Sequence, residues 1–185
     1  MRFLGLLTLG AAVTFMTAPI GVALSQPERA STTMYNGTGD AIGTVAFTQV
    51  GSWVHVDVDV SGLTPGFHGF HVHVTGSCDA ATDFNSAGGH LAVSSSHPAG
   101  GTHVEHAGDM TNLFVGTDGV GSMSVWSDRF AIGDLLAEGG RAVIIHGDPD
   151  NFVNIPARYG VTPDEATLNT GDAGPRMACG VLHAG

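Results

Sequence analysis

The sequence contains no lysine, and six arginines are its only permanently cationic side chains. With 17 acidic residues, the chain carries a formal net charge of −11 at pH 7. Binding of nucleic acid requires basic patches that neutralise phosphates, so this composition argues against nucleic acid as a partner. The same charge repels an anionic substrate at long range. A catalytic pocket for an anion would therefore depend on local positive charge.

Long hydrophobic runs are lacking except at the start of the chain, where Arg2 precedes an apolar run over residues 3–16 and small residues follow. This order is typical of a signal peptide. We predict a signal peptide over 1–25, a flexible tether over 26–31 and one domain over 32–185. The protein would be exported to the periplasm, the cell envelope or the medium, with transient membrane contact through the signal peptide only. An uncleaved anchor is the alternative, although the run falls short of the ~20 residues that a span needs.

Cysteine is scarce, with only Cys78 and Cys179. Export to an oxidising compartment favours a disulfide between them. Two unpaired buried thiols are the alternative. The disulfide would close a loop of about 100 residues and contribute on the order of 4 to 5 kcal/mol in the chain-entropy account.

Helical periodicity is almost absent, and alternating apolar and polar residues predict strands instead. The expected strands are residues 32–35, 43–49, 53–60, 67–74, 110–117, 121–127, 142–146 and 177–182. One short helical turn over 130–138 and two long loops over 75–109 and 147–175 complete the chain. The pattern predicts an all-β fold, an eight-stranded antiparallel Greek-key sandwich or barrel of immunoglobulin-like type with two long functional loops.

Histidine, in contrast, is abundant, with ten residues. In one expected strand, His71 and His73 would face one side, while Phe70, Val72 and Val74 would face the other. Two imidazoles held by a rigid strand suit copper, zinc or iron. The pair alone does not establish a metal site, because surface or hydrogen-bonded core histidines are the alternative.

Five motifs, taken together and in order, resemble the exported bacterial copper/zinc superoxide dismutases over about residues 32–181. They are Gly66-Phe67-His68-Gly69-Phe70-His71-Val72-His73, Ser86-Ala87-Gly88-Gly89-His90, His106-Ala107-Gly108-Asp109, Ile144-Ile145-His146 and Thr170-Gly171-Asp172-Ala173-Gly174-Pro175-Arg176-Met177-Ala178-Cys179-Gly180.

The resemblance implies one copper ion per chain, bound by His71, His73, His90 and His146. His90 would bridge copper and zinc as an imidazolate, which requires two cations to remove both ring protons. In the family's mechanism this histidine leaves copper, rebinds it and supplies a proton. Arg176 matches the guanidinium that holds the anion beside the open copper position. His90 and Arg176 are therefore the expected catalytic residues.

The resemblance also implies one zinc ion, bound by the bridging histidine together with His97, His106 and Asp109. Four protein ligands form the closed set that structural zinc prefers. His103 lies close to His106 and could replace it. Asp150 matches the carboxylate that orients ligands of both metals, although an ordinary loop carboxylate is the alternative.

The implied activity is dismutation of superoxide to oxygen and hydrogen peroxide by copper redox cycling, which would protect the cell envelope. A non-catalytic exported copper/zinc-binding protein on the same fold is the alternative. Zinc hydrolases and cupins also use His-x-His, but their following Asp-His or nearby Glu is missing after His73. The sequence leaves homodimer formation open.

Other residues have structural interpretations. We expect His68 to be a hydrogen-bonded core histidine, and His55 and His183 to be exposed. Four aromatic residues are expected to pack in the core or beneath loops: Phe70, Phe114, Phe152 and Trp126. The second long loop offers only Arg158 against Asp164 and Glu165, which predicts weak electrostatic steering of an anion.

Overall fold

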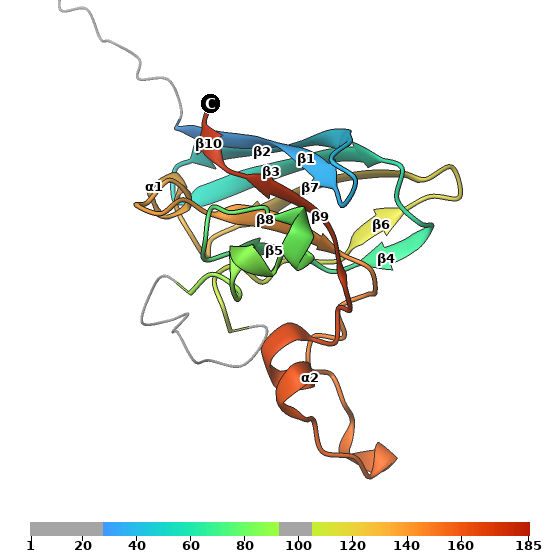
Figure 1. Cartoon of the computed structure of the whole chain (residues 1–185). Helices are drawn as coiled ribbons and strands as arrows, with labels where there is room; N and C mark the ends of the chain where they lie inside the picture. The colour runs from blue at the N-terminus through green and yellow to red at the C-terminus, as the bar shows by residue number, and fades with distance from the viewer. Residues whose placement is uncertain (1–27, 93–104) are drawn as a thin grey trace, which may run out of the picture.

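The computed structural model describes residues 28–92 and 105–185. One antiparallel sheet, in the order β4-β6-β7-β3-β2-β1-β9-β8-β5 with β10 on β1, curls into a nearly closed barrel (Figure 1). This confirms the predicted all-β antiparallel fold. The strands are β1 (Arg29–Asn36), β2 (Ala41–Val50), β3 (Trp53–Ser61), β4 (Gly66–His68), β5 (Phe70–His73), β6 (Leu113–Val115), β7 (Val120–Ser127), β8 (Ala142–His146), β9 (Arg176–Val181) and β10 (His183–Ala184).

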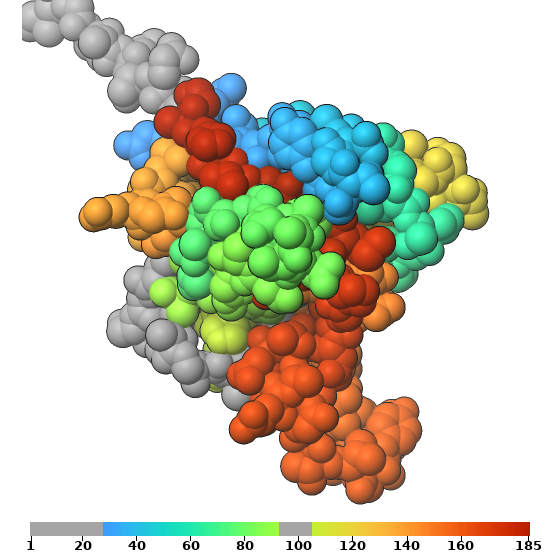
Figure 2. Space-filling view, in the orientation of Figure 1, coloured from blue at the N-terminus to red at the C-terminus, as the bar shows by residue number. Residues whose placement is uncertain are grey.

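Short helices lie in the connections. They are η1 (Ala80–Thr82), η2 (Asn85–Ala87), α1 (Ile132–Leu135), η3 (Ala157–Tyr159) and α2 (Glu165–Thr170). The segment that carries α2 projects away from the barrel (Figures 1 and 2). Within residues 28–92 and 105–185, every helix is too short or too polar to cross a membrane.

The alternation in β3 places its side chains on two different surfaces. Val54, Val56, Val58 and Val60 are at most 4% exposed and belong to the main core, whereas Trp53 faces outward with 47% exposure. Burial of a valine side chain contributes roughly 2 kcal/mol. The inward face of the strand therefore anchors it to the barrel and leaves the outward face to solvent.

The histidine-rich stretch forms two strands instead of the one predicted. Strand β4 pairs with β6, β5 pairs with β8, and Gly69 lies between them. The Gly69 amide donates to the Asp148 carbonyl (2.9 Å), and its carbonyl accepts from the His146 amide (2.8 Å). A Cβ atom at Gly69 would lie 2.6 Å from the Cβ of Ala173. The close approach of other segments at this glycine lets the chain change partner strands.

Other boundaries also differ from the prediction. β1 begins at Arg29 and buries Ala30 completely, so the end of the expected tether belongs to the sheet. The strand expected over 110–117 is reduced to Leu113–Val115. The split at Gly69 and the short β10 raise the number of strands in the described residues from eight to ten. The predicted signal peptide lies outside the described residues.

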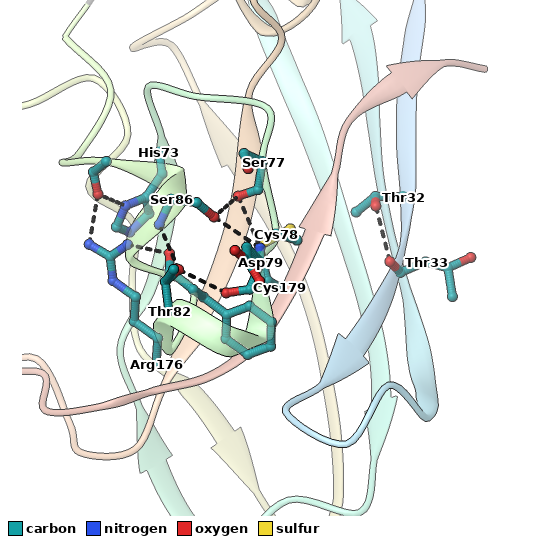
Figure 3. The surroundings of a disulfide bond; sticks show 12 residues. Thr32, Thr33, His73, Ser77, Cys78, Asp79, Thr82, Ser86, Arg176 and Cys179 are labelled. Atoms are coloured by element: carbon teal, nitrogen blue, oxygen red, sulfur yellow. Dashed lines mark hydrogen bonds between the residues drawn. A yellow bond between two sulfur atoms is a disulfide. The ribbon is translucent and has the colours of Figure 1, made fainter.

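The predicted disulfide is confirmed. Cys78 and Cys179 are bonded, with their Cα atoms 5.6 Å apart (Figure 3). Cys179 and Phe84 belong to a second, smaller core cluster beside β8 and β9. The disulfide and this cluster hold the loop after β5 against the sheet.

The aromatic predictions were only partly correct. Phe70 is fully buried, but Phe114, Trp126 and Phe152 are 57%, 56% and 40% exposed. Phe114 and Trp126 occupy outward positions of β6 and β7, where the alternation of a strand sends a side chain to solvent. Phe152 lies in a loop with φ of 56°.

Of the remaining side-chain predictions, some are confirmed and others were wrong. His68 is 1% exposed, with its ring nitrogens 2.6 Å from the His146 carbonyl and 2.7 Å from the Thr64 carbonyl, as expected of a core histidine. His183 is exposed, and His55 is half-buried on the outward face of β3. Val74, expected on the core face, lies beyond the end of β5 and is 38% exposed.

Candidate metal centre

Four buried histidines converge beside strands β5 and β8. His71 and His73 come from β5, His146 ends β8, and His90 lies on the loop that forms an isolated bridge with His73. One ring nitrogen from each of the four lies within 4.8 Å of the others. The structure therefore brings together all four residues that the sequence predicted around copper.

A buried carboxylate orients His71. The Nε2 of His71 lies 2.8 Å from the Asp150 Oδ2, and both side chains are fully buried. A carboxylate accepts this bond, so Nε2 carries the proton and Nδ1 has the lone pair that faces the cluster. Asp150 is itself held, because its amide donates to Asn112 Oδ1 (2.8 Å) and its Oδ1 accepts from the Phe152 amide (2.6 Å).

Backbone carbonyls orient two other rings. The Nδ1 of His73 donates to the Gly88 carbonyl (2.9 Å), and that of His146 donates to the Gly174 carbonyl (3.2 Å). In both rings Nε2 is then deprotonated. Both Nε2 atoms are buried and lack a hydrogen-bond partner among the described residues. Buried lone pairs of this kind suit a metal ion, which would compensate their loss of contact with water.

The electrostatics keep these rings neutral. Burial, together with charge repulsion from the neighbouring His71 and His90, lowers the pKa of His146 to about 3. The pKa of His73 also lies well below 6.5, first because of burial and then because of His90. Neutral imidazole is the form that binds a metal, so both rings are ready to bind at neutral pH without losing a proton.

A second cluster adjoins the first and shares His90 with it. The Nδ1 of His90 lies 2.7 Å from Asp109 Oδ1, and the Nδ1 of His106 lies 3.3 Å from Asp109 Oδ2. One ligand atom from each of these three residues lies within 4.8 Å of the others. Because Nδ1 of His90 faces this cluster, its Nε2 is directed toward the first one. His97 and the suggested substitute His103 lie outside the described residues.

Arg176 faces the first cluster. Its Nη1 donates to the Phe84 carbonyl and its Nη2 to the Gly88 carbonyl, each at 2.7 Å (Figure 3). Arg176 lines a cavity of about 660 Å³ together with His90 and His146. Burial lowers the pKa of the Arg176 guanidinium, but arginine remains charged in proteins. The cavity therefore combines a fixed cation with ring nitrogens of the histidine cluster.

The sequence motifs did not identify several supporting groups. Asn112 clamps Asp150 from the segment before β6, and its Nδ2 also donates to the Asp150 carbonyl (2.9 Å). The Gly88 carbonyl serves both Arg176 and His73. A sequence does not reveal the direction in which a backbone carbonyl points. The position of Gly88 within a motif was therefore the only sign that its carbonyl contributes to the site.

Together, the barrel and these clusters define a class of protein: a Greek-key β-barrel with two adjacent candidate metal sites that share one histidine. The comparisons with known proteins name the family. Residues 41–182 match the copper/zinc superoxide dismutase family (SODC). The chain belongs to this family.

Curated relatives agree. The chain is 42% identical over 166 residues to "Superoxide dismutase [Cu-Zn]" of Mycolicibacterium paratuberculosis, covering 81% of this chain and 71% of the relative. It is 39% identical to the protein of the same name from Mycobacterium tuberculosis, and the alignment covers 80% of this chain and 67% of that relative. The activity is thus dismutation of superoxide, with copper and zinc as cofactors.

Solved structures share the fold. A "SOD-like protein from Bacillus subtilis" is 26% identical with a TM-score of 0.65, and covers 83% of this chain and 97% of its own. The "clock protein EA4" is 27% identical with a TM-score of 0.65, and the match covers 88% of this chain and 98% of that protein's chain. In both cases the likeness therefore extends over most of the chain.

Proposed function

We propose that His71, His73, His90 and His146 hold the copper ion of an exported superoxide dismutase. The observation that carries this assignment is the convergence of four buried ring nitrogens, because two of these histidines, His90 and His146, also line one cavity with the charged guanidinium of Arg176. Histidine ligands suit copper in both of its common oxidation states. The adjoining cluster, His90, His106 and Asp109 with His97 added, would hold zinc.

The residues of the cavity have separate tasks. Bound copper supplies one-electron redox chemistry, in which one superoxide is oxidised to oxygen and the next is reduced to hydrogen peroxide. Arg176 attracts and orients the anion through its remaining N–H donors, because Nη1 and Nη2 each donate one of the five N–H groups of the guanidinium to a backbone carbonyl. His90 can hold and release a proton at Nε2, since its Nδ1 faces Asp109. Asp150 keeps the His71 ring in its tautomer.

Export and homodimer formation complete the proposal. A disulfide persists in oxidising compartments outside the cytoplasm, and the acidic surface keeps an exported protein soluble. There the enzyme would protect the cell envelope from superoxide. Two exposed phenylalanines, Phe67 and Phe114, pack with ring centroids 5.2 Å apart and offer an apolar patch for a second copy. Sedimentation of the wild type and of Phe114→Ser tests the dimer.

The second candidate is a non-catalytic copper/zinc-binding protein, since one structural neighbour is described only as a "SOD-like protein". Arg176 separates the two candidates. A metal buffer has no need of a fixed cation beside the ring nitrogens, whereas an enzyme acting on an anion does.

The test measures bound metal and rate together in the mature chain loaded with copper and zinc. His73→Ala should lose copper and activity, while His183→Ala, at an exposed position on β10, should keep both. Arg176→Ala should keep copper but lose roughly 10- to 100-fold in rate, because the orienting donors are gone. An inactive wild type with its copper bound would favour the buffering function.

A further inference from the structure

The outward face of β3 and β7 carries both tryptophans of the chain. Trp53 is 47% exposed and Trp126 is 56% exposed, although large apolar side chains are usually buried. Trp53 and His55 lie two residues apart on one strand, and Trp126 is the register partner of His55 on the other. Side chains two residues apart share a face, so the three rings form an aromatic platform. The platform lies on strands that contribute no ligand to the metal centre.

A row of hydrogen-bonding groups continues from this platform. The His55 ring packs on Trp126 with centroids 4.5 Å apart, while its Nε2 contacts Ser124 Oγ (2.8 Å) and its Nδ1 contacts Asp57 Oδ2 (3.1 Å). On the next rung, Ser122 donates to Asp59. These bonds hold the two carboxylates in place but leave them acceptor capacity toward solvent.

The backbone hydrogen-bonding groups of β3 are already paired with neighbouring strands. β3 pairs over its whole length with β2 on one side and β7 on the other. An extended peptide therefore cannot add to β3 as a further strand. A ligand must bind through side chains alone, by lying flat on the rings and hydrogen-bonding to the carboxylates and hydroxyls. A sugar ring, with apolar C–H faces and many hydroxyls, fits these demands better than a peptide.

The charge of this face restricts the class of ligand further. β3 and β7 carry two carboxylates on this face and no arginine. In register the nearest cation is Arg29, two strands away on β1, and Arg129, which lines a cavity with Trp126, donates to the His106 carbonyl. A polyanionic glycan would be repelled, whereas a protonated amine would be attracted to Asp57 and stack on the tryptophans. We propose that this face, defined by Trp53, His55, Asp57, Ser124 and Trp126, binds glycans that carry free amino groups.

Intrinsic fluorescence reports directly on the proposed site, because the chain has no tryptophan elsewhere. The metal-loaded enzyme would be titrated with a glucosamine hexamer at low salt. Parallel titrations would use an N-acetylglucosamine hexamer, spermine and a hexa-arginine peptide. We expect saturable quenching with the glucosamine hexamer and at least about tenfold weaker binding of the acetylated hexamer, the equivalent of one lost charged contact.

Variants distinguish this site from general attraction between polycations and an acidic protein. Trp126→Ala and Asp57→Asn should each weaken binding of the glucosamine hexamer by about tenfold, measured by calorimetry. The matched control is Tyr159→Ala, which removes another exposed aromatic ring outside this face and should leave binding unchanged. Dismutase activity should be normal in all three, which also shows that they are folded.

Three results would overturn the proposal. Equal binding by wild type and Trp126→Ala would mean that only net charge attracts the polymer. Binding of hexa-arginine or spermine as tight as that of the sugar would assign the face to basic peptides or polyamines. The absence of saturable quenching with the glucosamine hexamer would rule out the site. None of these results depends on the assignment of the metal ligands.

Discussion

Asp150 illustrates how one buried carboxylate can orient a histidine that we propose as a copper ligand. Its Oδ2 fixes the tautomer of His71, its Oδ1 accepts from the Phe152 amide, and Asn112 bonds to the Asp150 backbone. An acidic group buried with no water around it is costly unless hydrogen bonds compensate. The compensation here comes from His71 and the Phe152 amide, and the backbone bonds to Asn112 hold the Asp150 main chain in place, so the carboxylate is rigid.

Asp150→Asn should weaken copper binding by roughly 10- to 100-fold, the usual effect of losing an outer partner of a ligand histidine. The amide keeps the size of the side chain but removes the negative charge that makes the imidazole a better ligand. Copper affinity would be measured by competition with a chelator. Asp118→Asn, in the turn before β7, is the matched control. Equal affinity in both variants would mean that Asp150 is only structural.

The pKa shifts of the histidines predict how the metal-free protein responds to acid. His146 has a pKa of about 3 in the folded state because it is buried, whereas an unfolded histidine titrates near 6.5. Between these values the unfolded chain binds a proton that the folded chain does not. The free energy of unfolding should therefore fall as the pH falls from 6.5 toward 3, by at most about 1.4 kcal/mol per pH unit for this residue.

Urea unfolding in the presence of a chelator at several pH values between 7 and 4 would measure this slope. His146→Gln should reduce it, since glutamine does not titrate. A wild-type stability that is flat over this range would contradict the burial of a neutral ring.

At the scale of elements, the loop after β5 links the disulfide to the catalytic cavity. Cys78 ties one end of the loop to β9, Phe84 packs in the small core, and the Phe84 and Gly88 carbonyls hold Arg176. Gly88 adopts φ of 74°, and a Cβ atom there would lie 2.9 Å from Val74 Cγ2. The position of the guanidinium thus depends on a loop that has little regular structure of its own.

Reduction of the disulfide should lower stability and activity together. The loop closed by the bridge spans 101 residues, for which the entropic stabilisation is about 4.7 kcal/mol at most. Once released, the loop would no longer fix the carbonyls that orient Arg176. Unfolding and dismutation rates would be measured before and after reduction, and again after reoxidation. A reduced protein that retains its full rate would show that Phe84 and its neighbours suffice to hold the loop.

At the scale of the whole molecule, the negative net charge of the protein repels its anionic substrate, superoxide. The chain carries a net charge of −11, and the cavity that contains Arg176 is also lined by Asp83. The projecting segment that carries α2 adds two negative charges, Asp164 and Glu165, and one positive charge, Arg158. Arg176 is therefore a local attraction within a repulsive field.

The rate should consequently stay constant or rise as salt increases. Between about 0.01 M and 1 M salt, the Debye length shrinks from ~30 Å to ~3 Å, which screens long-range repulsion first. Dismutation would be followed by pulse radiolysis over this range, with sodium perchlorate compared against sodium fluoride to detect anion binding in the cavity. A steep fall in rate would mean that the surface attracts superoxide.

The sequence by itself determined the alternating strands, the candidate ligands, the pairing of two cysteines and the family. These features depend on local periodicity or on motifs, which are visible in a linear chain. His71 and His73 share a face simply because they are two residues apart on a strand. The inward valines of β3 were equally predictable.

Only the tertiary structure decided what lies around those residues. The split at Gly69, the clamp of Asn112 on Asp150, the double use of the Gly88 carbonyl and the outward position of Trp126 join segments far apart in sequence. Hydrogen bonds and close packing between such segments depend on direction and on distances of a few ångströms, and no local pattern encodes these. That is why the candidate ligands could be predicted from the chain, while most of the groups that orient them could not.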